Sequence, residues 1–328
     1  MINNRIVLVL GAGASMPYHF PSGAELKAEV QSFGTVRESS PFGKTFQPNS
    51  FDEQLFSSFQ RDLAQSPLNS IDAFLEARPE FLDIGKHTIA LLLIRKENQN
   101  QFLTANIDPE ENWYKYLFEL MLDEGIENLS YNKLTVITFN YDRSFEYYFV
   151  SGLMATYGLS FDEAQQSMNF IKVIHVHGQL GELIEAGVTQ SGRSYEPVAN
   201  AERVRVAARG IKIISELSTD PTSDDWSGFR NAWRELEQAR AIVFIGFGYN
   251  RNNVLRLLDC KVATDIEFLQ PEVTGTVQGL THSEIAVKVL PAFAERDVRF
   301  EPARNREAGA LTYIRDTLHI FVKTRTSD

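Results

Sequence analysis

Four short segments contain residue types that could do chemistry, and the first is the glycine loop Gly11-Ala12-Gly13-Ala14-Ser15. It follows the apolar run Ile6 to Leu10, which is typical of a strand buried on both faces. A strand that turns into a helix through glycines exposes backbone N–H groups, and the helix N-terminus adds partial positive charge. A pyrophosphate fits there, and the Ser15 hydroxyl can donate to it. A tight structural turn is the alternative that the loop alone leaves open.

The glycine loop lacks the full fingerprint of a dehydrogenase. Met16 stands where G-x-G-x-x-G would place its third glycine. The next strand of such a unit, with its ribose-binding acid, is also missing, because residues 30 to 50 have no strand pattern. The sequence therefore predicts a nucleotide-binding turn that does not belong to an ordinary dehydrogenase Rossmann unit.

The second segment contains Asn140 and Asp142, which follow the predicted strand Leu134 to Phe139. The two residues share a parity at the end of that strand, so we expect their side chains on one face. Asn and Asp are also common in turns and at helix N-caps, which is the structural alternative. We expect a functional pair because this strand should lie near the first one.

The third segment contains His175 and His177, at the end of a predicted strand from Lys172 to Val176. Two residues apart, they would lie on one face of a straight strand. His177 stands beside Gly178, where a ligand can approach, and it can act as a general base near neutral pH. We expect His175 to be a hydrogen-bonded core histidine. Two histidines without further ligands do not make a metal site.

The fourth segment, Gly246-Phe247-Gly248, follows the apolar run Ala241 to Ile245. A glycine pair after a buried strand is a second place where the backbone can meet a nucleotide. A plain turn between a strand and a helix is an equally good explanation.

The order of the elements predicts an α/β protein with a doubly wound, Rossmann-like parallel sheet and a helical insertion. The ligand site of such a sheet lies beyond the carboxyl ends of its strands. We expect a single domain over residues 1–328, a helical insertion over 25–130 and a C-terminal extension over 285–328. Helices within the insertion are predicted to begin near Ser70 and to cover 84–95 and 113–124.

The remaining elements are predicted from caps and apolar spacing. Helices are expected over 145–157, over 226–240 behind the cap Asp224-Asp225, and after the capping box of Thr281 and Glu284. Residues 181–202 are polar and predict a long loop. A last strand over 298–300 and a closing helix over 308–322 complete the expected order.

The composition excludes several classes of protein. Hydrophobic residues make up 43% of the 328 residues, which is enough for a sizeable core. The formal net charge of -11 does not favour direct nucleic-acid binding. No apolar run is long enough for a signal peptide or a membrane span, so we expect a cytoplasmic protein. The single cysteine, Cys260, excludes an internal disulfide and a four-cysteine zinc site, and is expected to be a small buried hydrophobe.

Taken in chain order, the segments GAGAS, FNYD, HG and GFG resemble the motif series of the sirtuin family. The resemblance is closest to the sirtuin-like proteins of bacterial anti-phage defence systems. The segments Phe20 to Leu26, Ser70 to Leu75 and Trp113-Tyr114-x-x-Leu117 also look like those proteins. At the level of motifs the resemblance extends from about residue 5 to residue 255.

The resemblance implies a role for each motif residue. The residues that would hold the phosphates and adjoining ribose of NAD are Gly11, Ala12, Gly13 and Ser15. Asn140 would hold the nicotinamide ribose and position the attacking water, Asp142 would support the ribose site, and His177 would be the base. Gly246 and Phe247 would flank the adenosine, while Gly248 stands where the family often has serine.

The expected reaction depends on cysteines that are missing. Protein-deacylating sirtuins bind a structural zinc through two Cys-x-x-Cys pairs, and this chain has one cysteine. The zinc-less defence relatives are similar to NAD glycohydrolases, which release nicotinamide and leave ADP-ribose without any metal. The resemblance therefore implies depletion of cellular NAD, under the control of a partner or an assembly. A sirtuin-like deacylase or ADP-ribosyltransferase, and a non-catalytic NAD- or ADP-ribose-binding sensor, are the alternatives.

The resemblance also implies other proteins. Sirtuin-like defence proteins work as oligomers or with a partner encoded nearby, such as a nucleic-acid translocase, an argonaute-like protein or a nucleotide-processing enzyme. Within this sequence nothing favours one of these partners over another.

Overall fold

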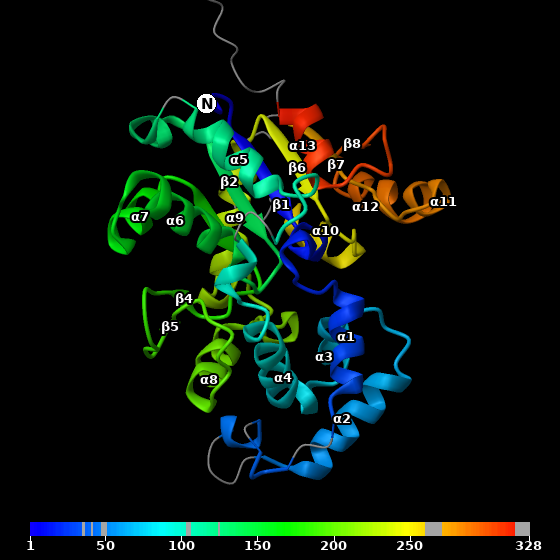
Figure 1. Cartoon of the computed structure of the whole chain (residues 1–328). Helices are drawn as coiled ribbons and strands as arrows, with labels where there is room; N and C mark the ends of the chain where they lie inside the picture. Colours follow the sequence, from blue (N-terminus) through cyan, green and yellow to red (C-terminus); the bar gives the residue numbers. More distant parts are fainter. Residues whose placement is uncertain are drawn as a thin grey trace, which may run out of the picture.

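A computed structural model describes residues 1–34, 37–40, 42–46, 51–102, 106–123, 125–259 and 271–318, so the prediction for Cys260 lies outside the described residues. Six parallel strands form one sheet in the order β3-β2-β1-β6-β7-β8 (Figure 1). They are β1 (Ile6–Leu10), β2 (Leu134–Thr138), β3 (Lys172–His175), β6 (Ala241–Ile245), β7 (Glu272–Gly275) and β8 (Phe300–Pro302). When only the strands of this sheet are counted in chain order, β6, β7 and β8 become the fourth, fifth and sixth strands. The strand order is then that of the doubly wound dinucleotide-binding fold, which confirms the predicted fold class.

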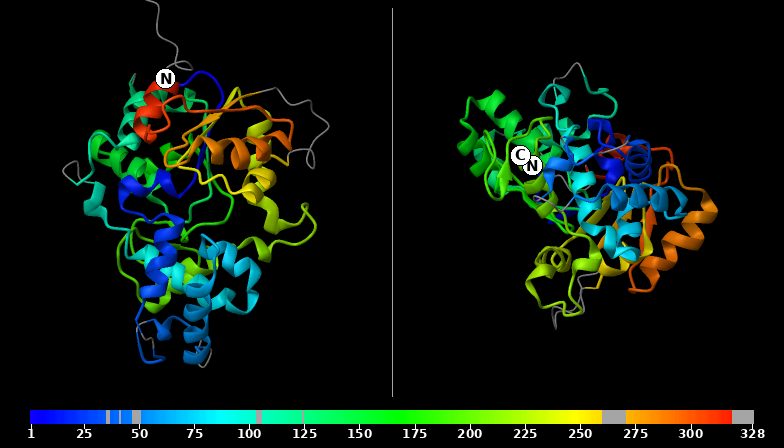
Figure 2. Two further views of the ribbon diagram at one scale, coloured as in Figure 1. Left: turned by 90° about the vertical axis from the view of Figure 1, so that its right-hand side faces the viewer. Right: turned by 90° about the horizontal axis from the view of Figure 1, so that it is seen from below.

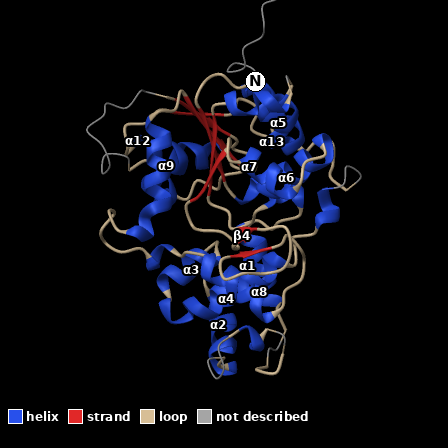
Figure 3. Cartoon of the chain, turned by 90° about the vertical axis from the view of Figure 1, so that its left-hand side faces the viewer, coloured by secondary structure: helices blue, strands red, loops and turns tan. Residues whose placement is uncertain are grey.

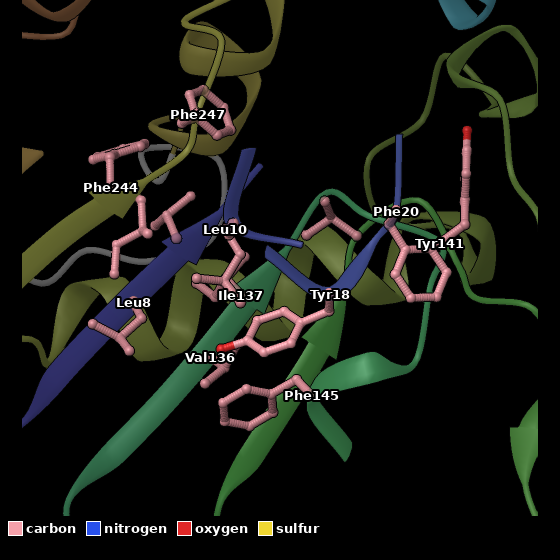
Figure 4. Close-up of a cluster of buried hydrophobic side chains, with 14 of the residues drawn as sticks. Leu8, Leu10, Tyr18, Phe20, Val136, Ile137, Tyr141, Phe145, Phe244 and Phe247 are labelled. Atoms are coloured by element: carbon pink, nitrogen blue, oxygen red, sulfur yellow. The ribbon is translucent and has the colours of Figure 1, made fainter. Parts of the chain in front are cut away.

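The central strands β1, β2 and β6 are buried along their whole length. Strands covered on both faces need apolar side chains on both faces, which is why IVLVL and AIVFI show no alternation. Leu8, Val136 and Phe244 come from these three strands and belong to one hydrophobic cluster (Figure 4). Tyr18 and Phe145, from the segments after β1 and β2, join the same cluster.

Helices cover both faces of the sheet (Figure 3). On one side lie α5 (Trp113–Leu122), α6 (Ser144–Tyr157), α7 (Phe161–Met168) and α13 (Ala310–Leu318). On the other side lie α9 (Ser227–Glu237) and α12 (Leu290–Ala294), with α10 (Arg251–Leu257) packed against both. A short helix α11 (His282–Glu284) leads into α12 through a π-helical turn, Ile285–Val289.

A helical lobe lies beyond the carboxyl ends of the strands (Figures 1 and 2). Its members are α1 (Gly23–Ser32), α2 (Glu53–Gln65), α3 (Ile71–Ala77), α4 (Leu82–Ile94) and α8 (Ala201–Gly210). The first four follow β1 in the chain, and α8 packs on α4 from a later segment. Side chains cap the entry of α1, α2 and α3, and the cap of α3 is Ser70, where the sequence predicts a helix to begin.

The strands after β1 agree with the prediction within one residue for β2 and β3, and β6 agrees at both ends. Strand β7 is absent from the sequence-based prediction, because Glu-Val-Thr-Gly is short and only one of its residues is strongly apolar. The last predicted strand, 298–300, is displaced, since β8 begins at Phe300.

The segment 181–202, predicted as a long loop, contains regular structure. Two-residue strands β4 (Glu182–Leu183) and β5 (Gly192–Arg193) pair with each other, and α8 begins at Ala201. The Asn200 side chain caps α8 by accepting from the N–H of Arg203. The helical pattern of this segment is weak, because four of the ten residues of α8 are charged.

Two predicted helices are shorter than expected. Asp224 and Asp225 lie within a 3₁₀ turn, Asp224–Trp226, so α9 begins only at Ser227. Helix α13 begins at Ala310, and the predicted end near 322 lies outside the described residues. The capping box of Thr281 and Glu284 is present, as predicted.

Within the described ranges, every helix is too short or too polar to cross a membrane.

Candidate functional site

A cleft of about 920 Å³ opens at the carboxyl ends of β1, β2 and β6. The strand order reverses between β1 and β6, and doubly wound sheets bind their ligands at such a switch point. Helices α1 and α3 of the helical lobe line one side of the cleft, and α10 and α12 line the other. Each of the four predicted segments contributes at least one lining residue: Ala12, Asn140, His177 and Phe247.

The glycines of the first and fourth segments allow two loops to pack on each other. A β-carbon on Gly11 would lie 2.7 Å from the carbonyl oxygen of Gly246, and one on Gly13 would lie 2.8 Å from the Gly246 Cα. The N–H of Gly13 donates to that carbonyl at 3.0 Å. Among the described residues, the N–H of Ala12 alone in this loop lacks an acceptor, and Ala12 lines the cleft. Gly11, Gly13 and Gly246 therefore allow the two loops to pack closely on each other.

The glycine loop does not lead directly into an α-helix, which corrects the prediction. It forms two 3₁₀ turns, Ala12–Ala14 and Met16–Tyr18, and His19 then adopts a left-handed conformation with φ 65°. The helix N-terminus at the cleft is that of α1, where Ser22 and Glu25 form a capping box. Gly23 and Ala24 in its first turn line the cleft, so the partial positive charge comes from a helix later in the chain.

Asn140 lines the cleft with a side chain whose orientation is fixed. Its Nδ2 donates to the Gly11 carbonyl oxygen at 2.9 Å and to the Ser15 Oγ at 3.0 Å. Both amide hydrogens are thereby used, which leaves Oδ1 as an acceptor. An amide held in this way can orient a water or a sugar hydroxyl.

Ser15 and Asp142 lie beneath Asn140 and are almost fully buried, so neither lines the cleft. Ser15 hydrogen-bonds to Asp142, and Asp142 accepts from the N–H and hydroxyl of Ser144. The Ser144 hydroxyl also meets Tyr114 Oη at 2.8 Å. Burial raises the pKa of Asp142, while its hydrogen bonds with Ser144 and Ser15 act in the opposite direction. Ser15 and Asp142, which the sequence predicts to contact the ligand, therefore lie together beneath Asn140 and support its side chain.

His177 lines the cleft beside the rings of Phe139 and Phe229, at centroid distances of 5.2 Å and 5.7 Å. Burial lowers the pKa of His177 to about 4, and the positive charge of Arg256 adds to this effect. A hydrogen bond with the backbone of Lys212 opposes it only in part. The ring is therefore neutral at pH 7 and able to accept a proton.

His175 does not share a face with His177, in contrast to the prediction. Strand β3 ends at His175, so the alternation of a straight strand does not continue to His177. His175 lines a second pocket of about 580 Å³, together with Glu146. Its Nε2 lies 2.7 Å from a Glu146 carboxylate oxygen and its Nδ1 lies 2.9 Å from the Asn140 carbonyl oxygen. It is a hydrogen-bonded, largely buried histidine, as expected.

Phe247 is nearly buried, and its ring lies 5.0 Å from that of Phe139 at 80°. Phe244 lies 5.2 Å away, so the aromatic wall of the cleft continues into the core of the sheet (Figure 4). Gly248 lines the cleft with open space around it.

Asp72 and Tyr141 form a further pair in the cleft that sequence reasoning did not assign to the site. Asp72 belongs to α3, and its carboxylate accepts from the hydroxyl of Tyr141, the residue between Asn140 and Asp142. Burial raises the pKa of Asp72, against the hydrogen bond from Tyr141. The available signal for Asp72 is the segment Ser70 to Leu75, which the sequence relates to a helix start and to the family resemblance but not to the site.

Ion pairs of both signs line the rest of the cleft. Arg256 Nη1 lies 3.6 Å from a Glu76 carboxylate oxygen, and Lys288 Nζ lies 3.5 Å from a Glu284 carboxylate oxygen. Arg251 pairs with Glu295. These charges are therefore compensated within the protein.

The described part of the chain holds no group of three or more His, Cys, Asp or Glu side chains that could bind a metal. No protein-family model and no curated protein matches the sequence.

Proposed function

We propose that the chain is a sirtuin-like NAD glycohydrolase, which cleaves the bond between nicotinamide and ribose and leaves ADP-ribose. The observation that carries the proposal is the meeting of Asn140 and His177 in one cleft at the switch point of a doubly wound sheet. A dinucleotide is the expected ligand at such a position.

The residues of the cleft supply the parts that the reaction needs. Displacement at the anomeric carbon passes through an oxocarbenium-like state and needs an oriented water and an oriented ribose. Asn140 Oδ1 would accept from the water or a ribose hydroxyl, because Nδ2 is already bonded to Gly11 and Ser15. His177 would take up a proton through the ribose hydroxyls, since its ring is neutral at pH 7.

The cleft also has features that suit the two ends of NAD. The α1 N-terminus at Gly23 and Ala24 and the free N–H of Ala12 would favour the pyrophosphate. The aromatic wall around Phe139 and Phe247 would cover a base. The role in anti-phage defence by NAD depletion, and the control by an oligomer or a partner protein, rest on the motif resemblance and form part of the proposal.

The test is a measurement of nicotinamide release from NAD by the full chain, alone and with the products of neighbouring genes. We expect release that is lost in Asn140→Ala and in His177→Ala. The exposed residues Asn231 and His282 provide matched controls, because Asn231→Ala and His282→Ala change the same residue types at positions that do not line the cleft.

Three other results would contradict the proposal. Release that strictly requires an acetylated peptide would indicate a deacylase, and transfer of ADP-ribose to protein would indicate a transferase. Binding of ADP-ribose, measured by calorimetry, without turnover under any of these conditions would indicate a sensor module.

A further inference from the structure

His175 lies between the backbone of Asn140 and the carboxylate of Glu146, outside the cleft. Nδ1 lies 2.9 Å from the Asn140 carbonyl oxygen and Nε2 lies 2.7 Å from Glu146 Oε1. The exposed fractions of the two side chains are 8% for His175 and 16% for Glu146. The contacts are therefore held within the protein, where water competes weakly for them.

Both partners of the ring are hydrogen-bond acceptors. A carbonyl oxygen and a carboxylate oxygen each need a donor, so both ring nitrogens must carry a hydrogen. A neutral imidazole has one such hydrogen and can satisfy only one of the two. The geometry thus fits the doubly protonated form, in which Glu146 compensates the positive charge.

The contact from His175 completes the set of bonds around Asn140. The side chain is fixed by Gly11 and Ser15, and the Asn140 N–H donates to the Thr138 Oγ1 at 3.0 Å. The carbonyl oxygen of Asn140 is the remaining main-chain group, and His175 is the side chain that bonds to it. We infer that His175 is a positioning residue, which, held by Glu146, fixes the main chain at Asn140 and so the amide that orients the attacking water. This inference rests on the proposed function.

The charges around His175 favour its protonated form. Burial opposes the charge, but the Glu146 carboxylate of α6, the Asn140 carbonyl and the Asp142 carboxylate together raise the pKa of His175 above its ordinary value. Glu182 of β4 lines the same pocket and adds a negative charge. On β3 itself, Lys172 is paired with Glu235 of α9 at 2.6 Å.

A pH profile separates this role from a merely structural one. His177, with a pKa of about 4, stays neutral from pH 6 upward and gives no basic limb. Loss of the His175 proton should therefore reduce turnover as the pH rises through its pKa. In Glu146→Gln the carboxylate charge is gone, so that basic limb should move to lower pH by about one unit or more.

Two further variants sharpen the experiment. His175→Asn retains an amide N–H that can donate to the Asn140 carbonyl and does not titrate, so its profile should lack the basic limb. Glu182→Gln removes a charge from the same pocket without removing a bond to the ring, so it should move the limb less than Glu146→Gln does. Thermal melting and ADP-ribose binding at pH 7 show whether each variant is folded.

A second readout does not need turnover. In protein labelled with ¹⁵N at asparagine, the amide shifts of Asn140 should titrate with the pKa of His175 in the wild type and should not do so in His175→Asn. No release of nicotinamide with this coupling intact would overturn the proposed function alone. Turnover with equal basic limbs in the wild type and Glu146→Gln, or Asn140 shifts that ignore His175, would overturn the inference.

Discussion

A β-carbon on Gly246 would lie 2.1 Å from the backbone nitrogen of Ala14, so the turn after β6 and the glycine loop after β1 are in main-chain contact. Gly246 also has a φ of 56°, which L side chains rarely adopt. Gly246 is therefore required, together with Gly11 and Gly13, for the close packing of the two loops that shape the switch point.

We predict that Gly246→Ala lowers the free energy of unfolding by roughly 2 to 4 kcal/mol, from backbone strain and overlap together. Gly248→Ala is the matched control, because a β-carbon there meets nothing within 4 Å. It should change stability by less than about 0.5 kcal/mol. Chemical denaturation of both variants measures the difference, and equal stabilities would show that the loops can separate at little cost.

Burial on both faces is the reason that the sequence predicts β1, β2 and β6. The side chains of these strands are buried and, apart from Thr135 and Thr138 of β2, apolar, so the strand boundaries follow from where the apolar run stops. Strand β7 lies nearer the edge and has the polar residues Glu272 and Thr274, so its pattern is weak. The pattern of helix α8 is similarly weak, because its charged residues are interspersed among small apolar ones.

The sequence predicts which segments meet at the site but not which way their side chains point. Asn140 and His177 line the cleft, whereas Ser15 and Asp142 turn inward. That difference depends on 3₁₀ turns after Gly11, which are set by packing on Gly246 and by the bond from Trp113 Nε1 to the Ala14 carbonyl. Trp113 is 99 residues from Ala14, and no local pattern encodes a contact at that separation.

The pKa of His177 should depend on Arg256. A positive charge near the ring disfavours the imidazolium, so removing it in Arg256→Gln should raise the pKa from about 4 toward the ordinary value of 6.5. Turnover should then begin to fall at a higher pH as the solution is acidified, because the base becomes protonated sooner. NMR titration of the His177 ring measures the shift directly.

Arg251→Gln is the matched control for this titration. Arg251 also lines the cleft, but it is paired with Glu295 and is not among the groups that act on His177. Its loss should leave the pKa of His177 where it is. Equal shifts in the two variants would indicate a general effect of cleft charge instead of a specific effect of Arg256.

The pair of Tyr141 and Asp72 should contribute to stability and to the ionisation of Asp72. Tyr141→Phe removes the hydroxyl that donates to the carboxylate, which should cost about 1 to 2 kcal/mol of unfolding free energy. The pKa of Asp72 should rise further, because the lost hydrogen bond favours the charged form. Denaturation at pH 7 measures the cost, with Tyr131→Phe as control, since Tyr131 is 63% exposed. A variant as stable as this control would show that the hydroxyl is readily replaced by water.

The variant Ser15→Ala tests whether Ser15 binds the ligand directly or supports the side chain of Asn140. If its hydroxyl held the NAD phosphates, Ser15→Ala would weaken ligand binding. The structure instead gives Ser15 bonds to Asn140 Nδ2 and Asp142 and no place in the lining of the cleft. We therefore expect Ser15→Ala to lower kcat about ten-fold or more while ADP-ribose binding changes little, because the Asn140 amide loses one of its two acceptors.

Ser144→Ala is the control for the Ser15 variant. Ser144 belongs to the same buried network, through Asp142 and Tyr114, but makes no bond to Asn140. Its loss should reduce stability and leave kcat within about two-fold of the wild type for the folded protein. Calorimetric binding of ADP-ribose and steady-state nicotinamide release separate the two effects. Weaker ADP-ribose binding at unchanged kcat in Ser15→Ala would show instead that Ser15 contacts the ligand. Because Ser15 does not line the cleft, the 3₁₀ turn that contains Ala12–Ala14 would then have to open when NAD binds.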